Sequence, residues 1–294
     1  MKHWTWPILI AGIIVLTACS SSTSEDSSQS GNSAYYIENK GSDTLVNLAL
    51  AWAERYQVEY PDIQISVTGG GSGTGFTALI NGTIDIANAS RQIKDLEIEQ
   101  AESAGFEPYE ITVANDAIAV IVNPENPVSE LTLDQVSRIY KGEINNWSEV
   151  GGEDRPIVRL SRETNSGTHV YFLETVIRLG DEEDTDIFSA DTLLLPSSEG
   201  IISEVSDNPN AIGYDGLGYI TDEVKTVALA SKEGRAYILP SAATVIDGTY
   251  PVSRGLYMYT RGEPEGIIKD YLDWILSEEA QEIVTDLGFV PILD

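Results

Sequence analysis

The sequence has few of the residues on which most catalytic and metal sites depend. Its 294 residues include one cysteine, Cys19, and two histidines, His3 and His169. A single cysteine forms neither an intrachain disulfide nor a cysteine-rich metal site, and two histidines leave little for a zinc site or a histidine-based triad. We therefore expect no metal, no other cofactor and no enzymatic activity.

Basic residues and long apolar runs are also scarce. The chain has 17 Lys and Arg against 47 Asp and Glu, a formal charge of −30. A nucleic-acid binder needs a basic footprint, and so does a protein that docks on anionic lipid, so both classes are excluded. One apolar segment alone excludes a polytopic membrane protein, while 42% hydrophobic residues are enough for a sizeable core.

That apolar segment, residues 6–18, predicts an export signal. It follows Lys2 and is shorter than the roughly 20 residues of a membrane-spanning helix. It ends in Leu-Thr-Ala-Cys, which resembles the bacterial lipobox, whose cysteine is acylated and becomes the first mature residue. The alternative is an uncleaved anchor with a chance cysteine. We expect a signal peptide over residues 1–18, a lipid anchor on Cys19 bearing acyl chains such as palmitate, and a flexible Ser-rich tether over residues 19–34. The folded part is then extracytoplasmic and held at the cell membrane.

The remaining chain alternates between strand and helix patterns. Strands are predicted at 35–38, 63–67, 84–87, 111–113, 117–122, 156–160, 212–214, 224–229 and 257–259, and helices after 44 and at 76–80, 133–140, 167–179 and 265–287. This alternation predicts an α/β fold with largely parallel sheets. The length favours two lobes over one core.

Three polar turns each follow a predicted strand and precede a predicted helix. They lie at residues 41–44, 71–74 and 165–168 and carry Gly with Ser or Thr. Helix N-termini present unpaired N–H groups and a partial positive charge, so several of them together form an anion site. Arg162 adds a guanidinium that matches a tetrahedral oxyanion. The alternative is that each turn is an ordinary N-cap and Arg162 a surface ion pair.

Nucleotide binding and hydrolysis find little support in the same segments. No lysine follows the glycines of residues 69–75, so this is not a Walker A loop, and Ser72 does not lie in a Gly-x-Ser-x-Gly motif. His169 is predicted to lie on a helix surface or at the rim of a cleft rather than to act as a general base.

An ordered set of segments resembles one known family, the PstS-type phosphate-binding proteins of bacterial phosphate ABC transporters. The segments are 41–45, 69–75, 85–91, 131–147, 162–168, 211–214 and 288–291. Together they extend the resemblance over about residues 35 to 292. It implies a two-lobe periplasmic-binding-protein fold of type II that closes on one phosphate through a two-strand hinge. Lobe I would comprise residues 35–119 and 254–294, and lobe II residues 120–253.

The resemblance also implies a set of phosphate-binding residues. They are Ser42, Thr44, Leu45, Ser72, Ser90, Arg91, Asp116, Arg162, Ser166, Gly167 and Thr168. In some members of the family an aspartate after the short strand accepts the phosphate proton. Arg91 occupies that position here, which is a departure, and Asp116 is the best substitute because it precedes the expected crossover.

The implied function is capture of inorganic phosphate outside the membrane by a monomer that delivers it to permease subunits. Binding is reversible, so no chemistry is required. The alternatives are a binder of sulfate, molybdate or tungstate, an extracellular hydrolase, and a sensory or adhesive lipoprotein that uses the same fold.

Overall fold

The computed structural model describes residues 35–181 and 183–292. The predicted signal peptide, tether and Cys19 lie outside these residues. The strands are β1 (Tyr35–Gly41), β2 (Ile63–Thr68), β3 (Ile86–Ala89), β4 (Pro108–Val122), β5 (Glu130–Thr132), β6 (Val158–Arg162), β7 (Leu193–Leu195), β8 (Ala211–Gly216), β9 (Lys225–Thr226), β10 (Ala228–Ala230) and β11 (Ser253–Arg261). The α-helices are α1 (Val46–Glu59), α2 (Ser72–Ile80), α3 (Asp95–Ser103), α4 (Leu133–Tyr140), α5 (Gly167–Phe172), α6 (Ser198–Asp207), α7 (Ala242–Ile246), α8 (Gly266–Ile275) and α9 (Glu278–Asp286).

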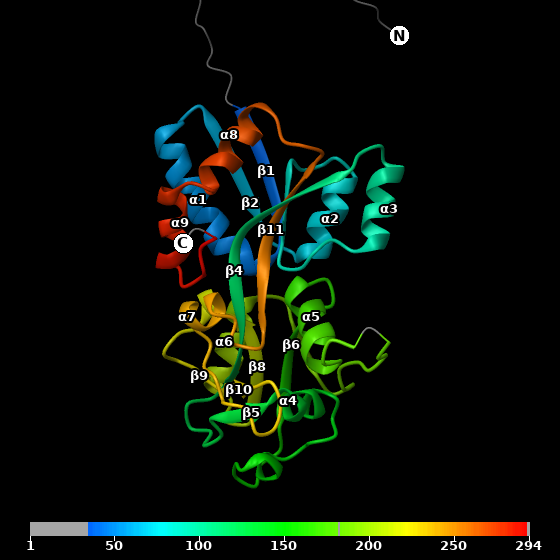
Figure 1. Cartoon of the computed structure of the whole chain (residues 1–294), viewed down its shortest axis with the longest axis vertical. Coiled ribbons are helices and arrows are strands. Elements are labelled where there is room, and N and C mark those ends of the chain that lie inside the picture. The colour runs from blue at the N-terminus through cyan, green and yellow to red at the C-terminus, as the bar shows by residue number, and fades with distance from the viewer. Residues whose placement is uncertain (1–34, 182, 293–294) are drawn as a thin grey trace, which may run out of the picture. The chain divides into compact units, whose positions relative to one another are not determined.

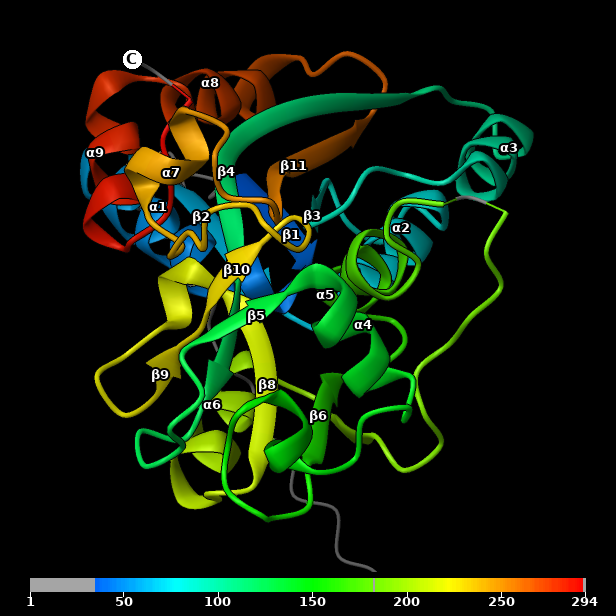
Figure 2. The same ribbon diagram turned by 60° about the horizontal axis from the view of Figure 1, so that its bottom comes forward.

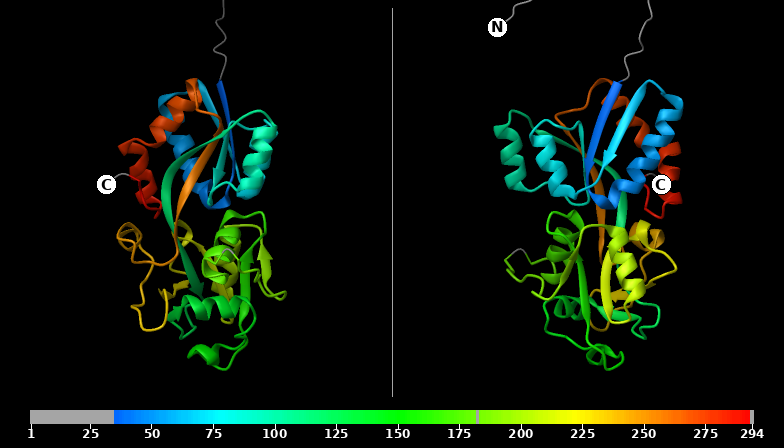
Figure 3. Two further views of the ribbon diagram at one scale, coloured as in Figure 1. Left: turned by 45° about the vertical axis from the view of Figure 1, so that its right-hand side comes forward. Right: turned by 180° about the vertical axis from the view of Figure 1, so that it is seen from behind.

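Within these residues the fold divides into two lobes (Figure 1). One contains α1 to α3 with α8 and α9, the other α4 to α7, and the view from behind shows the same division (Figure 3). The main sheet has the order β2-β1-β3-β11-β4-β8-β6-β7, with β9 added beside β4. This is the predicted α/β architecture with two lobes.

Two strands, β4 and β11, run through both lobes (Figure 1). They pair antiparallel with each other, and β4 continues antiparallel to β8. β1 is parallel to β2 and β3, and β6 is parallel to β7 and β8. The expectation of largely parallel sheets is therefore only partly right: the sheet is mixed because the strands that leave one lobe and return to it run in opposite directions.

The predicted segments 111–113 and 117–122 belong to the single strand β4, and this places Asp116 inside a strand rather than at its start. The polar residues between the segments suggested a break. Instead the pairing with β11 shifts register between Leu256 and Tyr257, and Asn115 bridges to Val290. A bulge of this kind bends a strand without ending it.

Apolar side chains of helices pack together in both lobes. In the first, Leu48, Trp52 and Tyr56 of α1 pack with Tyr271 of α8 and Val284 of α9. Trp52 Nε1 also donates to the Ala280 carbonyl at 2.8 Å. This burial of an amphipathic face fixes α1 against the C-terminal helices.

In the second lobe, β6 and β8 lie side by side (Figure 2). Val136 and Tyr140 of α4 pack with Phe172 of α5 and Tyr214 of β8. The Phe172 and Tyr214 rings stack with centroids 3.6 Å apart. This cluster supports the segment that carries Arg162 and Thr168.

The C-terminal pattern predicted as one helix over 265–287 forms α8 and α9 instead. Ser277 interrupts it because its hydroxyl accepts from the Ala280 N–H and caps α9. In the part of the chain that the structure describes, no helix combines the length and the apolar character needed to cross a bilayer.

Candidate functional site

Three serine hydroxyls of the first lobe meet at one edge of the sheet. Ser42 follows β1, Ser72 begins α2, and Ser90 follows β3. Ser42 Oγ donates to Ser90 Oγ at 2.8 Å, and the Ser90 N–H donates to Ser72 Oγ at 3.1 Å. Gly41, with φ of 150°, makes this possible, because a Cβ there would lie 2.1 Å from the Asn88 carbonyl oxygen.

The second lobe brings the turn before α5 against these serines. Ser166 caps α5 by accepting from the Thr168 N–H at 3.2 Å. A Cβ on Gly167 would lie 2.3 Å from Ser72 Oγ, so the backbone of the second lobe touches the hydroxyls of the first. Thr168 Oγ1 lies 2.9 Å from Thr44 Oγ1, which belongs to the other lobe. Hydroxyl groups from both lobes therefore share one site.

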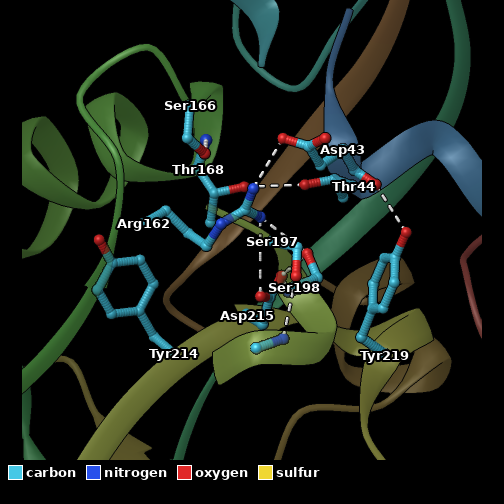
Figure 4. A network of polar contacts seen from close by, with 12 residues as sticks. Asp43, Thr44, Arg162, Ser166, Thr168, Ser197, Ser198, Tyr214, Asp215 and Tyr219 are labelled. Carbon is cyan, nitrogen blue, oxygen red and sulfur yellow. Dashed lines mark hydrogen bonds and ion pairs between the residues drawn. The ribbon is translucent and has the colours of Figure 1, made fainter. Parts of the chain in front are cut away.

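Arg162 is one cation of this site, and its side chain is only 1% exposed. Its Nη2 donates to Asp43 Oδ2 and to the Pro196 carbonyl, both at 2.8 Å, and its Nη1 donates to Ser198 Oγ at 2.8 Å (Figure 4). Asp215 Oδ2 lies 3.9 Å from Nη1. Arg162 Nε is buried and has no hydrogen-bond partner, so the guanidinium retains one unused donor.

Two fully buried carboxyls lie near the site. Burial raises the pKa of Asp215 to about 6, and the Arg162 charge opposes this rise. Burial also raises the pKa of Asp116, against the nearby charge of Arg254. Asp116 Oδ2 accepts from Arg254 Nη2 at 3.0 Å, and its Oδ1 accepts from the Leu217 N–H at 2.9 Å. The site thus combines positive and negative groups whose side chains are buried from solvent.

Contacts other than the hydroxyls also join the lobes around this site. Asn165 Nδ2 donates to the Gly70 carbonyl at 2.8 Å, and the Gly73 N–H donates to the Asn165 carbonyl at 3.2 Å. Tyr219 donates its phenolic hydrogen to the Asp43 carbonyl at 2.6 Å (Figure 4). Asp43 is therefore held from the second lobe by both Arg162 and Tyr219.

Most of the predicted site residues come together here. They are Ser42, Thr44, Ser72, Ser90, Arg162, Ser166, Gly167 and Thr168. Leu45 is adjacent, with its N–H donated to the Ser42 carbonyl at 3.1 Å. Phosphate contacts by these residues stay a prediction at this point.

Arg91 and Asp116 have other partners. Arg91 donates to both carboxylate oxygens of Glu97 at 2.7 and 2.8 Å, and its guanidinium lies 4.9 Å from the centre of the Phe76 ring. Asp116 pairs with Arg254, as described above. Arg91 Nε is buried without a hydrogen-bond partner, whereas both carboxylate oxygens of Asp116 are bonded. A role of either residue toward a ligand stays a prediction.

His169 lies inside the lobe, and the expectation of a surface or rim position is wrong. It is buried, its Nδ1 lies 3.0 Å from Ser161 Oγ, and its ring stacks on Phe188 with centroids 4.4 Å apart. Burial lowers the pKa of His169 to about 4. The helix pattern alone did not indicate that Phe188, from a distant segment, covers this ring.

Sequence reasoning missed Asp43, Ser198 and Asp215 as partners of Arg162, and Arg254 as a second buried cation. A signal existed for Arg254, because basic residues are scarce in this chain and this one directly follows the expected crossover near Ser253. No sequence pattern pointed to Ser198 or Asp215. Their contact with Arg162 depends on how β8 and α6 pack.

A cavity of about 860 Å³ opens beside the site. Its lining includes Arg91, Lys94, Arg178 and Arg254, together with Tyr171. Lys94 on one lobe lies 3.5 Å from Glu174 on the other. Within the described residues, no group of three or more His, Cys, Asp or Glu side chains is arranged to hold a metal ion.

The sequence is similar to those of known binding proteins. A profile of the PBP superfamily domain matches residues 25–279. The chain is 36% identical to the phosphate-binding protein PstS of Pseudomonas aeruginosa, over 87% of this chain and 83% of that protein. It is 32% identical to PstS of Bacillus subtilis, over 98% of this chain and 93% of that protein.

Solved structures give a similar result. A phosphate ABC transporter substrate-binding protein with bound phosphate from Clostridium perfringens is 33% identical, with a TM-score of 0.77. The match covers 88% of this chain and 100% of the Clostridium perfringens chain. A phosphate-binding protein structure with bound phosphate that is only 15% identical still has a TM-score of 0.71, which shows the shared fold.

Proposed function

Since the chain belongs to the PBP superfamily and, within it, to the PstS family of phosphate-binding proteins, we propose that it captures inorganic phosphate outside the cytoplasm and delivers it to an ABC-type permease. One observation carries the proposal: hydroxyl groups from both lobes and the buried guanidinium of Arg162 lie together in one site. Such a set of donors suits a tetrahedral oxyanion.

The donors divide between the lobes. The first lobe offers the hydroxyls of Ser42, Thr44, Ser72 and Ser90 and the N–H of Leu45, and the second offers Arg162, Ser166, Thr168 and the Gly167 N–H. The Ser42 hydroxyl and the Leu45 N–H bond to Ser90 Oγ and to the Ser42 carbonyl, and phosphate would replace these partners. Phosphate bound by both groups would stabilise contact between the lobes, so ligand binding and lobe closure are one equilibrium. Arg91 lines the cavity beside these donors, and we propose that its positive charge contributes to binding of the anion from there.

Lobe motion would use β4 and β11. We place lobe I at residues 35–119 and 254–294 and lobe II at 120–253, because the chain crosses between them in these two strands. Two adjacent strands can bend together while the sheets on each side stay rigid. The bulge between Leu256 and Tyr257 is a local weak point in their pairing.

Asp116 remains our candidate for the acceptor of the phosphate proton. Phosphate at neutral to alkaline pH keeps at least one O–H, which a carboxylate can accept, whereas sulfate offers only lone pairs. Burial of Asp116 beside the site makes an unpaired contact with sulfate costly. Asp116 Oδ1 accepts from the Leu217 N–H and Oδ2 accepts from Arg254. A phosphate O–H that bonds to Oδ2 would therefore compete with Arg254.

The function involves binding without catalysis. Ser161 and His169 form a hydroxyl–imidazole pair, but both side chains are buried, and Ser161 Oγ also lies 2.6 Å from the Tyr214 hydroxyl. The global charge of −30 opposes an anion, yet salt at about 0.15 M screens charges beyond about 8 Å. Local donors therefore decide the affinity.

Attachment is proposed through acyl chains on Cys19, with residues 19–34 as the tether and the protein acting as a monomer. The function is tested by uptake of labelled phosphate in the native host. Deletion of the gene should abolish uptake at low phosphate concentration, the wild-type gene should restore it, and a gene encoding Arg162→Ala should not. Unchanged uptake in the deletion strain would contradict the proposal.

A further inference from the structure

Arg254 occupies a position that links the two lobes. It is the second residue of β11 and pairs directly with Asp116 of β4. Its side chain is 2% exposed. Nη1 donates to the Ser90 carbonyl at 2.8 Å and Nη2 to Asp116 Oδ2 at 3.0 Å. The guanidinium is thus fixed between a backbone carbonyl of the site and a buried carboxylate.

The same Nη2 reaches two hydroxyl groups. It donates to Thr168 Oγ1 at 3.0 Å and to Thr44 Oγ1 at 3.4 Å. These two oxygens come from opposite lobes and lie 2.9 Å apart. Nη2 carries two hydrogens, and one of them points to Asp116, so the two threonine oxygens share the other. Because a guanidinium has donors and no acceptor, both oxygens act as acceptors toward Arg254.

This arrangement fixes the direction of the hydroxyl hydrogens. A threonine hydroxyl has a single hydrogen, and a neighbouring guanidinium repels it toward the opposite side of the oxygen. Because the two oxygens lie 2.9 Å apart, one hydroxyl donates to the other and one hydrogen remains. We infer that Arg254 is a positioning residue that leaves this remaining hydrogen on Thr168 and directs it toward the bound anion. The inference rests on the function proposed above and extends it to the residue that orients one of its donors.

The ion pair with Asp116 determines how Arg254 acts. Because the carboxylate offsets most of the cationic charge, Arg254 contributes through orientation of the hydroxyls more than through attraction of the anion. Orientation requires several donors in a fixed plane. A lysine at this position would keep the charge and could not contact Ser90, Asp116 and both threonines together.

A double-mutant cycle on the purified protein tests the inference, with phosphate affinity measured by calorimetry. Thr168→Val in the wild-type background should weaken phosphate binding about 10- to 100-fold, since it removes a hydrogen bond to a charged ligand. In the Arg254→Met background the same change should cost less than about 3-fold, because the hydroxyl is no longer oriented. Arg254→Lys should not restore the coupling.

Controls separate orientation from folding. Arg261→Met removes another arginine of β11 that stacks on an aromatic ring, Phe106, and should leave affinity within about 2-fold. If Arg254→Met does not fold, the cycle is run with Arg254→Met/Asp116→Asn against Asp116→Asn. Equal losses from Thr168→Val in both backgrounds overturn the inference while leaving the proposed function intact. No phosphate binding by the wild-type protein overturns both.

Discussion

Replacement of Arg162 is the perturbation whose consequences the structure defines most fully. Arg162→Ala removes hydrogen bonds to Asp43, Ser198 and the Pro196 carbonyl, and it leaves Asp215 without a nearby cation. Loss of one member of a buried charge pair costs about 3–5 kcal/mol of stability. We expect a lower free energy of unfolding for the ligand-free variant.

The same change should weaken phosphate binding by about 2–4 kcal/mol, which is about 30- to 1,000-fold in Kd. The reason is that the phosphate loses the Arg162 guanidinium, while the Asp43 carboxylate stays near the site without its partner. Arg162→Lys should recover part of this loss only, because a point charge replaces neither the fork to Asp43 and Ser198 nor the free Nε donor.

Calorimetry of phosphate binding and chemical denaturation together provide the assay. Arg159→Met is the matched control, since Arg159 lies on the same strand, is equally buried, and bonds to Asp191 and to carbonyl groups away from the site. It should lower stability and leave phosphate affinity within about 2-fold. If Arg162→Ala binds phosphate like the wild type, or if Arg159→Met weakens binding as much, the placement of the site is wrong.

Four further predictions follow from individual residues. Gly167→Ala should weaken phosphate binding at least 10-fold by titration, because its Cβ would collide with two serine hydroxyls; equal affinity would contradict the lobe contact. Asp116→Asn should lower phosphate affinity and narrow the preference for phosphate over sulfate, and an unchanged ratio in competition titrations would assign the proton to another acceptor. Cys19→Ala should release the protein from the membrane fraction with unaltered phosphate affinity, whereas retention at the wild-type level would refute lipidation. The pKa of Asp215 rises from 3.8 to about 6 on folding, so its folded form binds the proton more tightly and its contribution to the free energy of unfolding falls as pH rises through that range. Asp215→Asn should remove this fall in the free energy of unfolding between pH 4 and pH 7. Denaturation midpoints of the variant that change between these pH values as much as those of the wild type would contradict the prediction.

The sequence predicted those parts of the site that depend on local patterns. The turns with Gly, Ser and Thr lie between strands and helices as expected, and Gly167 is needed because its backbone contacts Ser72. Such turns can be identified because their residue types follow from backbone geometry within a few positions.

The features of the site that the sequence did not predict depend on pairing between distant segments. Arg254 reaches the site only because β11 pairs with β4 in the register that places it opposite Asp116. Arg91 forms an ion pair with Glu97 at the start of the next helix, and the resemblance to the family did not imply this pair. These outcomes depend on strand register and side-chain direction, which a single sequence determines only through the complete fold.

Contacts that a local pattern does not show also explain the wrong ends of the predicted strands and helices. Polar residues within 114–116 suggested a strand end, yet pairing with β11 carries β4 through them. The apolar pattern of 265–287 continues across Ser277, but the hydroxyl of that residue begins a new helix. Tertiary pairing and a single cap decide the outcome in each case.

Calorimetric titration of the purified protein with phosphate, sulfate, arsenate and molybdate tests the central claim most directly. We predict saturable binding of one phosphate per chain, with competition by arsenate, which has the same charge and shape. Sulfate and molybdate should bind at least 100-fold more weakly, as a carboxylate near the site disfavours anions without a proton. Tighter binding of sulfate or molybdate than of phosphate, or no binding of phosphate, would contradict the account.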